Sequence, residues 1–307
     1  MKRDLVSILD IKDELSEIID LAMVVKKESK EGRDRPAFKG KTLAMIFEKP
    51  SLRTRVSFEV GFSQMGGNAL YLSPSEIQIG KRESVHDVGK VMSRFADMIM
   101  YRAFSHDMVA ELAKCTDVPV INGLDNMEHP CQAVADLLTM TEVKGSLRGR
   151  KMAWVGDGNN VLHSLMLGAS VLGMDVRIAC PKGYEPNGTL LAKAKEIALK
   201  NGSRVELSHD PNAAMNDADV VCTDTWVSMG DEAEQEKRLK AFAPFQVNAG
   251  LFARARPDAI FLHCLPAHRG QEVTDEVIDS DRSYVFQEAE NRMHAQKVIM
   301  LRLAGLR

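Results

Sequence analysis

The sequence predicts an α/β fold with two doubly wound parallel sheets. Short apolar runs alternate with amphipathic stretches along the chain, which is the pattern of strands and helices in βαβ units. The alternation occurs in two series, separated by a polar, glycine-bearing link at residues 144–149 that is typical of a domain boundary. The 307 residues are also more than one hydrophobic core usually needs. Because such sheets bind ligands beyond the carboxyl ends of their strands, we expect the active site in the cleft between the two domains.

The first domain is expected at residues 1–143. Its sheet begins at residues 42–47, an apolar run that predicts a buried parallel strand. A helix at 56–65, ended by the left-handed cap that Gly66 tolerates, and a strand at 69–72 complete a βαβ unit. The same alternation predicts helices at 84–95, 108–115 and 131–143 and strands at 98–101 and 118–121.

The second domain is expected at residues 150–288. Its alternation predicts five strands with helices between most of them, at 152–155, 175–179, 204–207, 220–223 and 260–262. A terminal helix is predicted at 291–303, with Gly305 as its stop. We expect the segment 289–307, which carries this helix, to return to the first domain.

The composition narrows the class of protein. Hydrophobic residues make up 45% and charged residues 27%, as in a soluble globular protein, and the net charge of -3 argues against a nucleic-acid or membrane partner. The five cysteines are scattered and form no C-x-x-C pair, which suggests a reducing compartment. The first residues carry acids throughout, unlike a signal or transit peptide, and no apolar run is long enough to span a bilayer. We therefore expect a cytoplasmic protein.

The segment from Phe47 to Arg55 has the features of a phosphate site. It lies where a strand hands over to a helix, and Ser51 is a good N-cap whose following amides are donors at the positive end of the helix dipole. Arg53, Thr54 and Arg55 add forked donors and a hydroxyl around one anion-sized space. The simpler alternative is a capped surface helix with two solvated arginines.

A histidine precedes a proline at a second predicted helix start. His129 is held in an extended conformation near the helix N-terminus, where the dipole disfavours imidazolium. A neutral ring could then donate a hydrogen bond to a polarised oxygen. The alternative is a loop histidine that caps Gln132.

The segment Gly156-Asp157-Gly158-Asn159-Asn160 follows a predicted strand and opens a helix. It is close to a dinucleotide fingerprint, but Val161 occupies the place of the third glycine and no acidic residue clearly ends the next strand. A nicotinamide-dependent dehydrogenase is therefore disfavoured. Asn160 remains an amide that is well placed to hold a polar ligand.

Three further segments end strands or begin a helix with polar residues. Asp224 could hold an amino group, or cap a helix before a flexible loop. Cys264 could be a nucleophile, but strand neighbours face opposite sides, so a dyad with His263 is not expected and a substrate-contacting or structural thiol is favoured. Arg292 could reach a carboxylate or carbonyl oxygen, or be a solvated arginine.

Read in chain order, the informative segments are F-E-K-P-S-x-R-T-R-x-S-F-E, Y-R at Tyr101, H-P-C-Q, G-D-G-N-N, D-x-x-x-S-M-G and H-C-L-P. Together they resemble the aspartate/ornithine carbamoyltransferase family, and the match runs from Phe47 to Lys297. The S-x-R-T-R and H-P-x-Q segments mark the superfamily, whereas S-M-G and H-C-L-P are similar to the ornithine branch.

The resemblance implies a role for each matching residue. It implies a carbamoyl phosphate site in which Gln78 reaches across a trimer interface, and an ornithine site whose S-M-G loop closes about a hinge at Gly230. The implied donor site consists of Ser51, Leu52, Arg53, Thr54, Gln78, Arg102, His129, Pro130, Cys131, Gln132, Cys264, Leu265 and Arg292. The implied ornithine site consists of Asn160, Asp224, Ser228 and Met229.

The implied mechanism uses side chains alone, with no metal or cofactor. The neutral δ-amine of ornithine attacks the carbonyl carbon, and Arg102, His129 and Thr54 stabilise the charge that grows on its oxygen, with Cys264 orienting the substrates. A homotrimer or an assembly of trimers is the implied self-association.

The chain departs from the family pattern at two places, and rival functions remain. Leu52 replaces a threonine of S-T-R-T-R, which removes a hydroxyl but keeps the backbone amide, and Lys81-Arg82 make the usual G-R-G-E-S loop more basic. Aspartate would want a basic second pocket, and putrescine would not need the S-M-G loop in this form. A non-catalytic phosphate-binding protein is disfavoured because the polar segments all fall at strand ends or helix starts.

Overall fold

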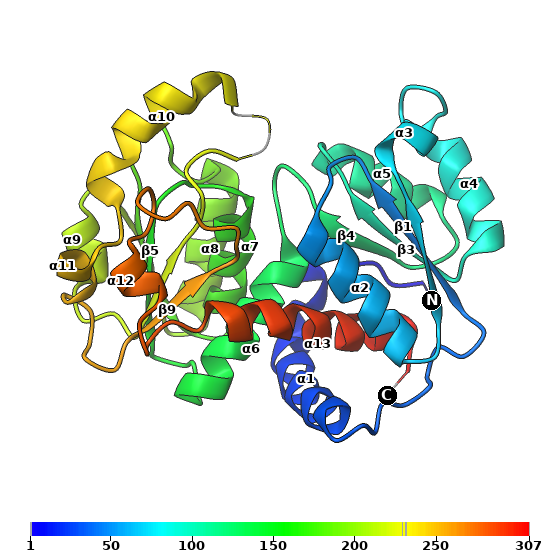
Figure 1. The fold of residues 1–307 in the computed structure, drawn as a ribbon, viewed down its shortest axis with the longest axis horizontal. Helices are drawn as coiled ribbons and strands as arrows, with labels where there is room; N and C mark the ends of the chain where they lie inside the picture. The colour runs from blue at the N-terminus through cyan, green and yellow to red at the C-terminus, as the bar shows by residue number, and fades with distance from the viewer. Residues whose placement is uncertain (1, 229, 231, 307) are drawn as a thin grey trace. The chain divides into compact units, whose positions relative to one another are not determined.

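The computed structural model describes residues 2–228, 230 and 232–306, and the chain divides into two compact units (Figure 1). Unit 1 comprises Met1–Leu138 and Glu290–Arg307, and unit 2 comprises Thr139–Ala289. Each unit contains one parallel sheet flanked by helices. The predicted fold class of two doubly wound parallel sheets is therefore confirmed.

The sheet of unit 1 has the strand order β2-β1-β3-β4, and all its pairs are parallel. The two inner strands, β1 and β3, are buried, and their side chains pack with those of the helices in one hydrophobic core. The strands are β1 (Thr42–Phe47), β2 (Asn68–Leu72), β3 (Met98–Arg102) and β4 (Val120–Leu124). The helices that lie within or enter this unit are η1 (Ile8–Glu14), α1 (Leu15–Lys30), α2 (Leu52–Gln64), α3 (Pro74–Ile77), α4 (Val85–Phe95), α5 (His106–Cys115), α6 (Pro130–Lys144) and α13 (Val285–Leu303).

The chain order reverses between β1 and β3, because β2 lies on one side of β1 and the chain then returns to the other side. Phe47 and Arg102 are paired at the carboxyl ends of these two strands. A reversal of this kind leaves a crevice where doubly wound sheets bind ligands. The loops that follow β1 and β3 are therefore the place to look for a site in unit 1.

The sheet of unit 2 has the strand order β7-β6-β5-β8-β9, also all parallel, and its reversal lies between β5 and β8. Its central strands contribute to a second hydrophobic core. The strands are β5 (Lys151–Val155), β6 (Asp175–Ala179), β7 (Val205–Ser208), β8 (Val220–Thr223) and β9 (Ile260–His263). The helices are α7 (Asn160–Val171), α8 (Gly188–Lys200), α9 (Pro211–Met215), η2 (Glu232–Glu234), α10 (Gln235–Phe242), η3 (Ala243–Phe245), α11 (Ala249–Phe252) and α12 (Asp275–Ile278).

Two helix starts differ from the prediction by more than two residues. The helix expected from residue 56 begins at Leu52, because the Ser51 hydroxyl caps it by accepting a hydrogen bond from the Thr54 amide. The helix expected from residue 291 begins at Val285. Its first turn holds Glu288, a buried acid that interrupts the apolar period on which the prediction relied.

Among the helices in the described part of the chain, none is long and apolar enough to cross a membrane.

Candidate active site

Four of the predicted donor-site residues meet in one hydrogen-bonded cluster in unit 1. The Thr54 hydroxyl accepts from Arg102 Nη1 at 3.2 Å and from Arg292 Nη2 at 2.7 Å. Arg292 Nη1 also donates to Gln132 Oε1 at 2.8 Å. All four side chains are buried, with Arg102 6% and Arg292 4% exposed. The bonds that join them go to neutral oxygens, so these bonds do not neutralise either guanidinium.

Separate elements deliver these side chains to the reversal point of the sheet. Arg102 ends β3, where the pairing with β4 shifts by one residue so that Gly123 is the extra residue of a bulge. A Cβ on Gly123 would lie 2.4 Å from Met100 Sδ, so a larger residue there would require the Met100 side chain to move. Thr54 sits in the first turn of α2, while α13 carries Arg292 and packs against α2 at Gly61 (Figure 1).

His129 lies beside the cluster, immediately before α6. Burial, followed by the charges of Arg292 and Arg102, holds the pKa of its ring well below the ordinary value of 6.5. The ring is therefore neutral near pH 7, in line with the sequence prediction. The cause is mainly burial and two arginines, whereas the sequence argument relied on the helix terminus.

Pro130 and Cys131 begin α6, and both are buried. Burial raises the pKa of the Cys131 thiol to about 12, and the thiol donates to the Asn122 carbonyl oxygen at 3.6 Å. The side chain is thus directed to the protein backbone. A ligand contact at Cys131 would have to use its backbone amide in the first turn of the helix.

The other predicted donor residues surround the start of α2 less tightly. Ser51 and Arg53 are half-buried, whereas the Leu52 side chain is 73% exposed. Gln78 caps the C-terminus of the short helix α3 in a left-handed conformation with φ 48°. Its side-chain amide donates to the Ser75 carbonyl oxygen at 3.5 Å. No contact given by the described residues joins Gln78 to the arginine cluster.

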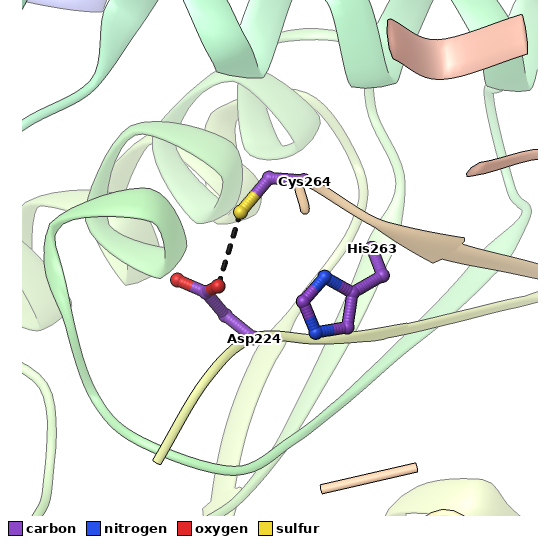
Figure 2. Close-up of side chains that lie close together, drawn as sticks. All are labelled: Asp224, His263 and Cys264. Carbon is purple, nitrogen blue, oxygen red and sulfur yellow. Dashed lines mark hydrogen bonds between the residues drawn. The ribbon is translucent and has the colours of Figure 1, made fainter. Parts of the chain in front are cut away.

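Unit 2 gathers a second set of predicted residues around Asp224, which directly follows β8. Cys264 Sγ donates to Asp224 Oδ1 at 3.0 Å (Figure 2). The Asn159 side-chain amide donates to Asp224 Oδ2 at 2.7 Å. The Thr225 backbone amide adds a third bond at 2.8 Å. The carboxylate is 6% exposed and is therefore fixed on several sides.

The His263 ring is hydrogen-bonded to Leu265 and Glu272, although Cys264 is its neighbour in the chain. Leu265 N donates to His263 Nδ1 at 3.0 Å, so the proton lies on Nε2, which faces Glu272 Oε1 at 3.2 Å. The expected absence of a Cys–His dyad agrees with this arrangement. The expected opposite orientation does not hold, because the strand ends at His263 and Leu265 has a positive φ of 56°.

Asp224, His263 and Cys264 each offer one ligand atom, and these atoms lie within 4.8 Å of one another (Figure 2). An oxygen, a nitrogen and a sulfur at this spacing could hold a soft divalent ion. In the structure the thiol is bonded to Asp224 and the imidazole to Glu272.

Backbone conformation and close packing explain the two glycines after β5, Gly156 and Gly158. A Cβ on Gly158 would lie 2.3 Å from Pro186 N, and Gly156 has φ 147°. Asn159 rather than Asn160 caps α7, by accepting from the amides of Val161 and Leu162. The segment thus brings the chain close to residues 184–186 and presents an amide to Asp224, which supports the rejection of a dinucleotide site.

The loop after Asp224 contains the predicted S-M-G residues. Ser228 is half-buried, Gly230 has φ 109°, and Met229 lies outside the described residues. Arg238 on α10 anchors the start of the loop, because it donates to the Trp226 carbonyl oxygen and pairs with Asp157.

Sequence analysis missed three residues that hold the two sites. Asn159 binds Asp224, while Asp125 and His106 hold the loop that leads to His129. An asparagine just before an apolar helical run is an N-cap signal that could have revealed Asn159. The pairing of Asp125 with His106 joins two loops of the sheet and has no local signal.

The comparisons with known proteins assign the two halves of the chain. Residues 3–142 match the family model for the carbamoyl-P binding domain of aspartate/ornithine carbamoyltransferase, and residues 148–303 match that for the Asp/Orn binding domain. The chain therefore belongs to the aspartate/ornithine carbamoyltransferase family.

Similar proteins bear a more particular name. Ornithine carbamoyltransferase of Methanobrevibacter smithii is 55% identical over 97% of this chain and 98% of its own, and that of Picrophilus torridus is 52% identical over 99% of both. The solved structure of ornithine carbamoyltransferase from Pyrococcus furiosus is 50% identical, with a TM-score of 0.97, and covers 100% of this chain and 99% of that one. A relative from Thermoplasma volcanium, 51% identical over 98% of both chains, is named as catabolic.

Proposed function

We propose that this protein transfers the carbamoyl group of carbamoyl phosphate to the δ-amine of L-ornithine, giving L-citrulline and phosphate. The observation that carries the proposal is the buried cluster of Thr54, Arg102, Gln132 and Arg292. The first three of these residues lie in the half matched by the carbamoyl-P binding domain. Two buried guanidiniums that converge on one hydroxyl suit a ligand that carries negative charge.

The donor site divides into a phosphate part and a carbamoyl part. The capped start of α2, with Ser51, the Leu52 amide, Arg53 and Thr54, would take the phosphate. The carbamoyl part would consist of Arg102, His129, Pro130, Cys131, Gln132 and Arg292, with Gln78 supplied at the phosphate from another subunit. Neutral His129 and the two arginines can then donate hydrogen bonds to the carbonyl oxygen.

The acceptor site would be centred on Asp224 in unit 2. Its carboxylate suits the α-ammonium group of ornithine, and Asn160, Ser228 and Met229 would complete the contacts to the amino-acid end. Cys264 and Leu265 are assigned to both substrates. The bond from the Cys264 thiol to Asp224 supports a thiol that orients rather than attacks.

The reaction needs no covalent intermediate on the protein. The neutral δ-amine nitrogen forms a bond to the carbonyl carbon, and charge grows on the carbonyl oxygen within reach of Arg102, His129 and Thr54. The C–O bond to phosphate then breaks, and the proton lost from nitrogen leaves with phosphate. Orientation of the two substrates supplies much of the rate.

Self-association as a homotrimer, or an assembly of trimers, is part of the proposal. Leu52, Val56 and Val60 recur at helical spacing on α2 with exposed fractions of 73%, 47% and 39%, and Leu70 on the edge strand β2 is 46% exposed. An apolar surface of this kind is typical of a subunit interface. Light scattering of the purified protein would measure the mass directly.

We further propose a cytoplasmic enzyme of arginine metabolism. All five cysteines are free thiols, which fits a reducing compartment. Either direction, arginine biosynthesis or the reverse catabolic route, uses the same two sites.

The test is carbamoyl transfer by the purified protein, supplied with carbamoyl phosphate and separately with ornithine, aspartate, putrescine and N-acetylornithine. We expect citrulline from ornithine and no transfer to the others. Turnover with another amine would keep the donor site and refute the assignment of Asp224 and the S-M-G loop. Tight binding of carbamoyl phosphate without any turnover would indicate a non-catalytic phosphate-binding protein.

A further inference from the structure

The loop between β4 and α6 is organised by one fully buried carboxylate. Asp125 Oδ1 accepts from the backbone amides of Met127 and Glu128, both at 2.7 Å. Its own amide donates to the Glu128 carbonyl at 3.0 Å, which closes the turn. The residue that follows this turn is His129, so the carboxylate sets the direction in which the chain enters the donor site.

The second oxygen of the same carboxylate connects the turn to other elements. Oδ2 accepts from Asn122 Nδ2 on β4 at 2.8 Å and faces His106 Nδ1 at 2.7 Å. Because an ionised carboxylate only accepts hydrogen bonds, His106 Nδ1 must carry a proton. The first residue of α5 thereby holds the loop before α6 from the side.

His106 touches this loop a second time. Its backbone amide donates to the Asn126 side-chain oxygen at 2.9 Å. The His106 side chain is 30% exposed, whereas that of Asp125 is 0% exposed. His106 is therefore the member of the pair that water can reach.

We propose that Asp125 and His106 are positioning residues for carbamoyl transfer, because their side-chain bond holds the turn that presents His129 to the donor. This inference rests on the proposed function for its kinetic consequence, but its structural consequence is independent of turnover. Neither residue touches the proposed substrates.

The bond also gives the positioning a pH dependence. The hydrogen bond that His106 donates to Asp125 is the largest cause that raises the pKa of His106 above 6.5. The charges of Asp125, Glu128 and Asp107 raise this pKa further, and burial opposes the rise. Because the pKa of His106 is raised in the folded state, the charged His106–Asp125 pair stabilises the fold fully below pH 6.5. This stabilisation is lost as the pH rises through the raised pKa. A neutral ring with its proton on Nδ1 keeps the weaker, uncharged bond.

The kinetic test compares the wild type with His106→Ala and His106→Asn, with His86→Ala as a matched control. His86 also pairs through Nδ1 with an aspartate, Asp87 at 3.1 Å, but on the exposed surface of α4. We expect His106→Ala to lower kcat/KM for carbamoyl phosphate by about tenfold while KM for ornithine is unchanged, since misplacement of a catalytic group by ~1 Å is this costly or more.

His106→Asn is the conservative rescue. Its amide nitrogen reaches the position of Nδ1 and can donate to Asp125, so most of kcat/KM should return. Having no charge, it should fall short of the wild type below pH 6.5 and approach it as pH rises. The inference is overturned if His106→Ala matches the His86→Ala control, if His106→Asn rescues nothing, or if both substrates are affected alike.

A measurement without turnover separates this inference from the proposed function. The imidazole C2–H resonance of His129, assigned with a His129→Gln variant, is expected to shift in His106→Ala and not in His86→Ala. An unmoved resonance overturns the positioning role. Failure to carbamoylate any acceptor, with the resonance shifted, refutes the proposed function alone.

Discussion

The two candidate sites use the same architecture with opposite charge. In unit 1 the reversal between β1 and β3 is lined by Arg102 and Arg292, and in unit 2 the end of β8 presents Asp224. Both sites take a strand end and the first turn of a following helix, α2 in one unit and α7 in the other. The scaffold therefore supplies the position and a few side chains supply the ligand preference.

The sites also differ in what their central group is bonded to. In the unit 1 cluster two buried cations donate to neutral oxygens, and the ligand proposed for this site is an anion. In unit 2 a single carboxylate accepts from a thiol, a side-chain amide and a backbone amide, none of them charged. A doubly charged donor on the first site and an ammonium group on the second would complete the two arrangements.

The largest effect is expected from Arg102→Ala. Removal of a donor to the developing oxyanion should lower kcat on the order of 10²–10³-fold. KM for ornithine should change much less, because the other site is intact. Steady-state kinetics with both substrates measure the change in kcat and in each KM. Arg35→Ala is the control, since Arg35 is an exposed arginine of unit 1 that pairs with Glu28. Unchanged turnover in Arg102→Ala would show that Arg102 does not stabilise the charge on the carbonyl oxygen.

Asp224→Asn should affect the proposed ornithine site of unit 2. The asparagine side chain has no negative charge to pair with an ammonium group, and its NH2 group cannot accept the hydrogen bond that Asn159 donates to the carboxylate. KM for ornithine should therefore rise by about 10- to 100-fold. KM for carbamoyl phosphate should stay near that of the wild type. Asp210→Asn is the matched control, because Asp210 caps α9 in the same unit and asparagine caps equally well. Equal changes in both KM values would mean that the carboxylate is structural.

The sequence located the strands of both sheets better than the contacts at their ends. β1, β6 and β8 have the predicted bounds, because short apolar runs between polar segments define a buried parallel strand locally. The start of α13 was missed because its first turn buries the acidic Glu288, whose carboxyl oxygen accepts a hydrogen bond from the His263 amide. Periodicity cannot anticipate a partner 25 residues away in the chain.

The sites show the same division. Motifs predicted Thr54, Arg102, Gln132 and Arg292, which the structure brings together although they span most of the chain. The bond between Asp125 and His106 depends on the approach of the loops after β3 and β4, which only the folded sheet sets. The residues proposed to contact a ligand thus lie in recognisable motifs, whereas the residues that hold them in place are found from the geometry of the fold.

The smallest effect is expected from Leu52→Thr, which restores the hydroxyl of the family pattern. The Leu52 side chain is 73% exposed, and the donor proposed from this position to phosphate is the backbone amide, which the substitution keeps. We therefore expect KM for carbamoyl phosphate to fall by no more than about twofold, within the range of one weak solvated hydrogen bond. Leu199→Thr, at an 80% exposed leucine of unit 2, controls for loss of surface apolarity.

The same variant tests what the exposed leucine is for. Leu52 continues the apolar row of Val56 and Val60, so a polar residue there should weaken self-association at low protein concentration. A lower mass in light scattering with an unchanged KM would show that the leucine at position 52 serves the subunit interface. A several-fold gain in donor affinity with unchanged mass would instead show that the phosphate site of unit 1 uses the side chain at this position, and that the backbone of α2 alone is an incomplete anion site.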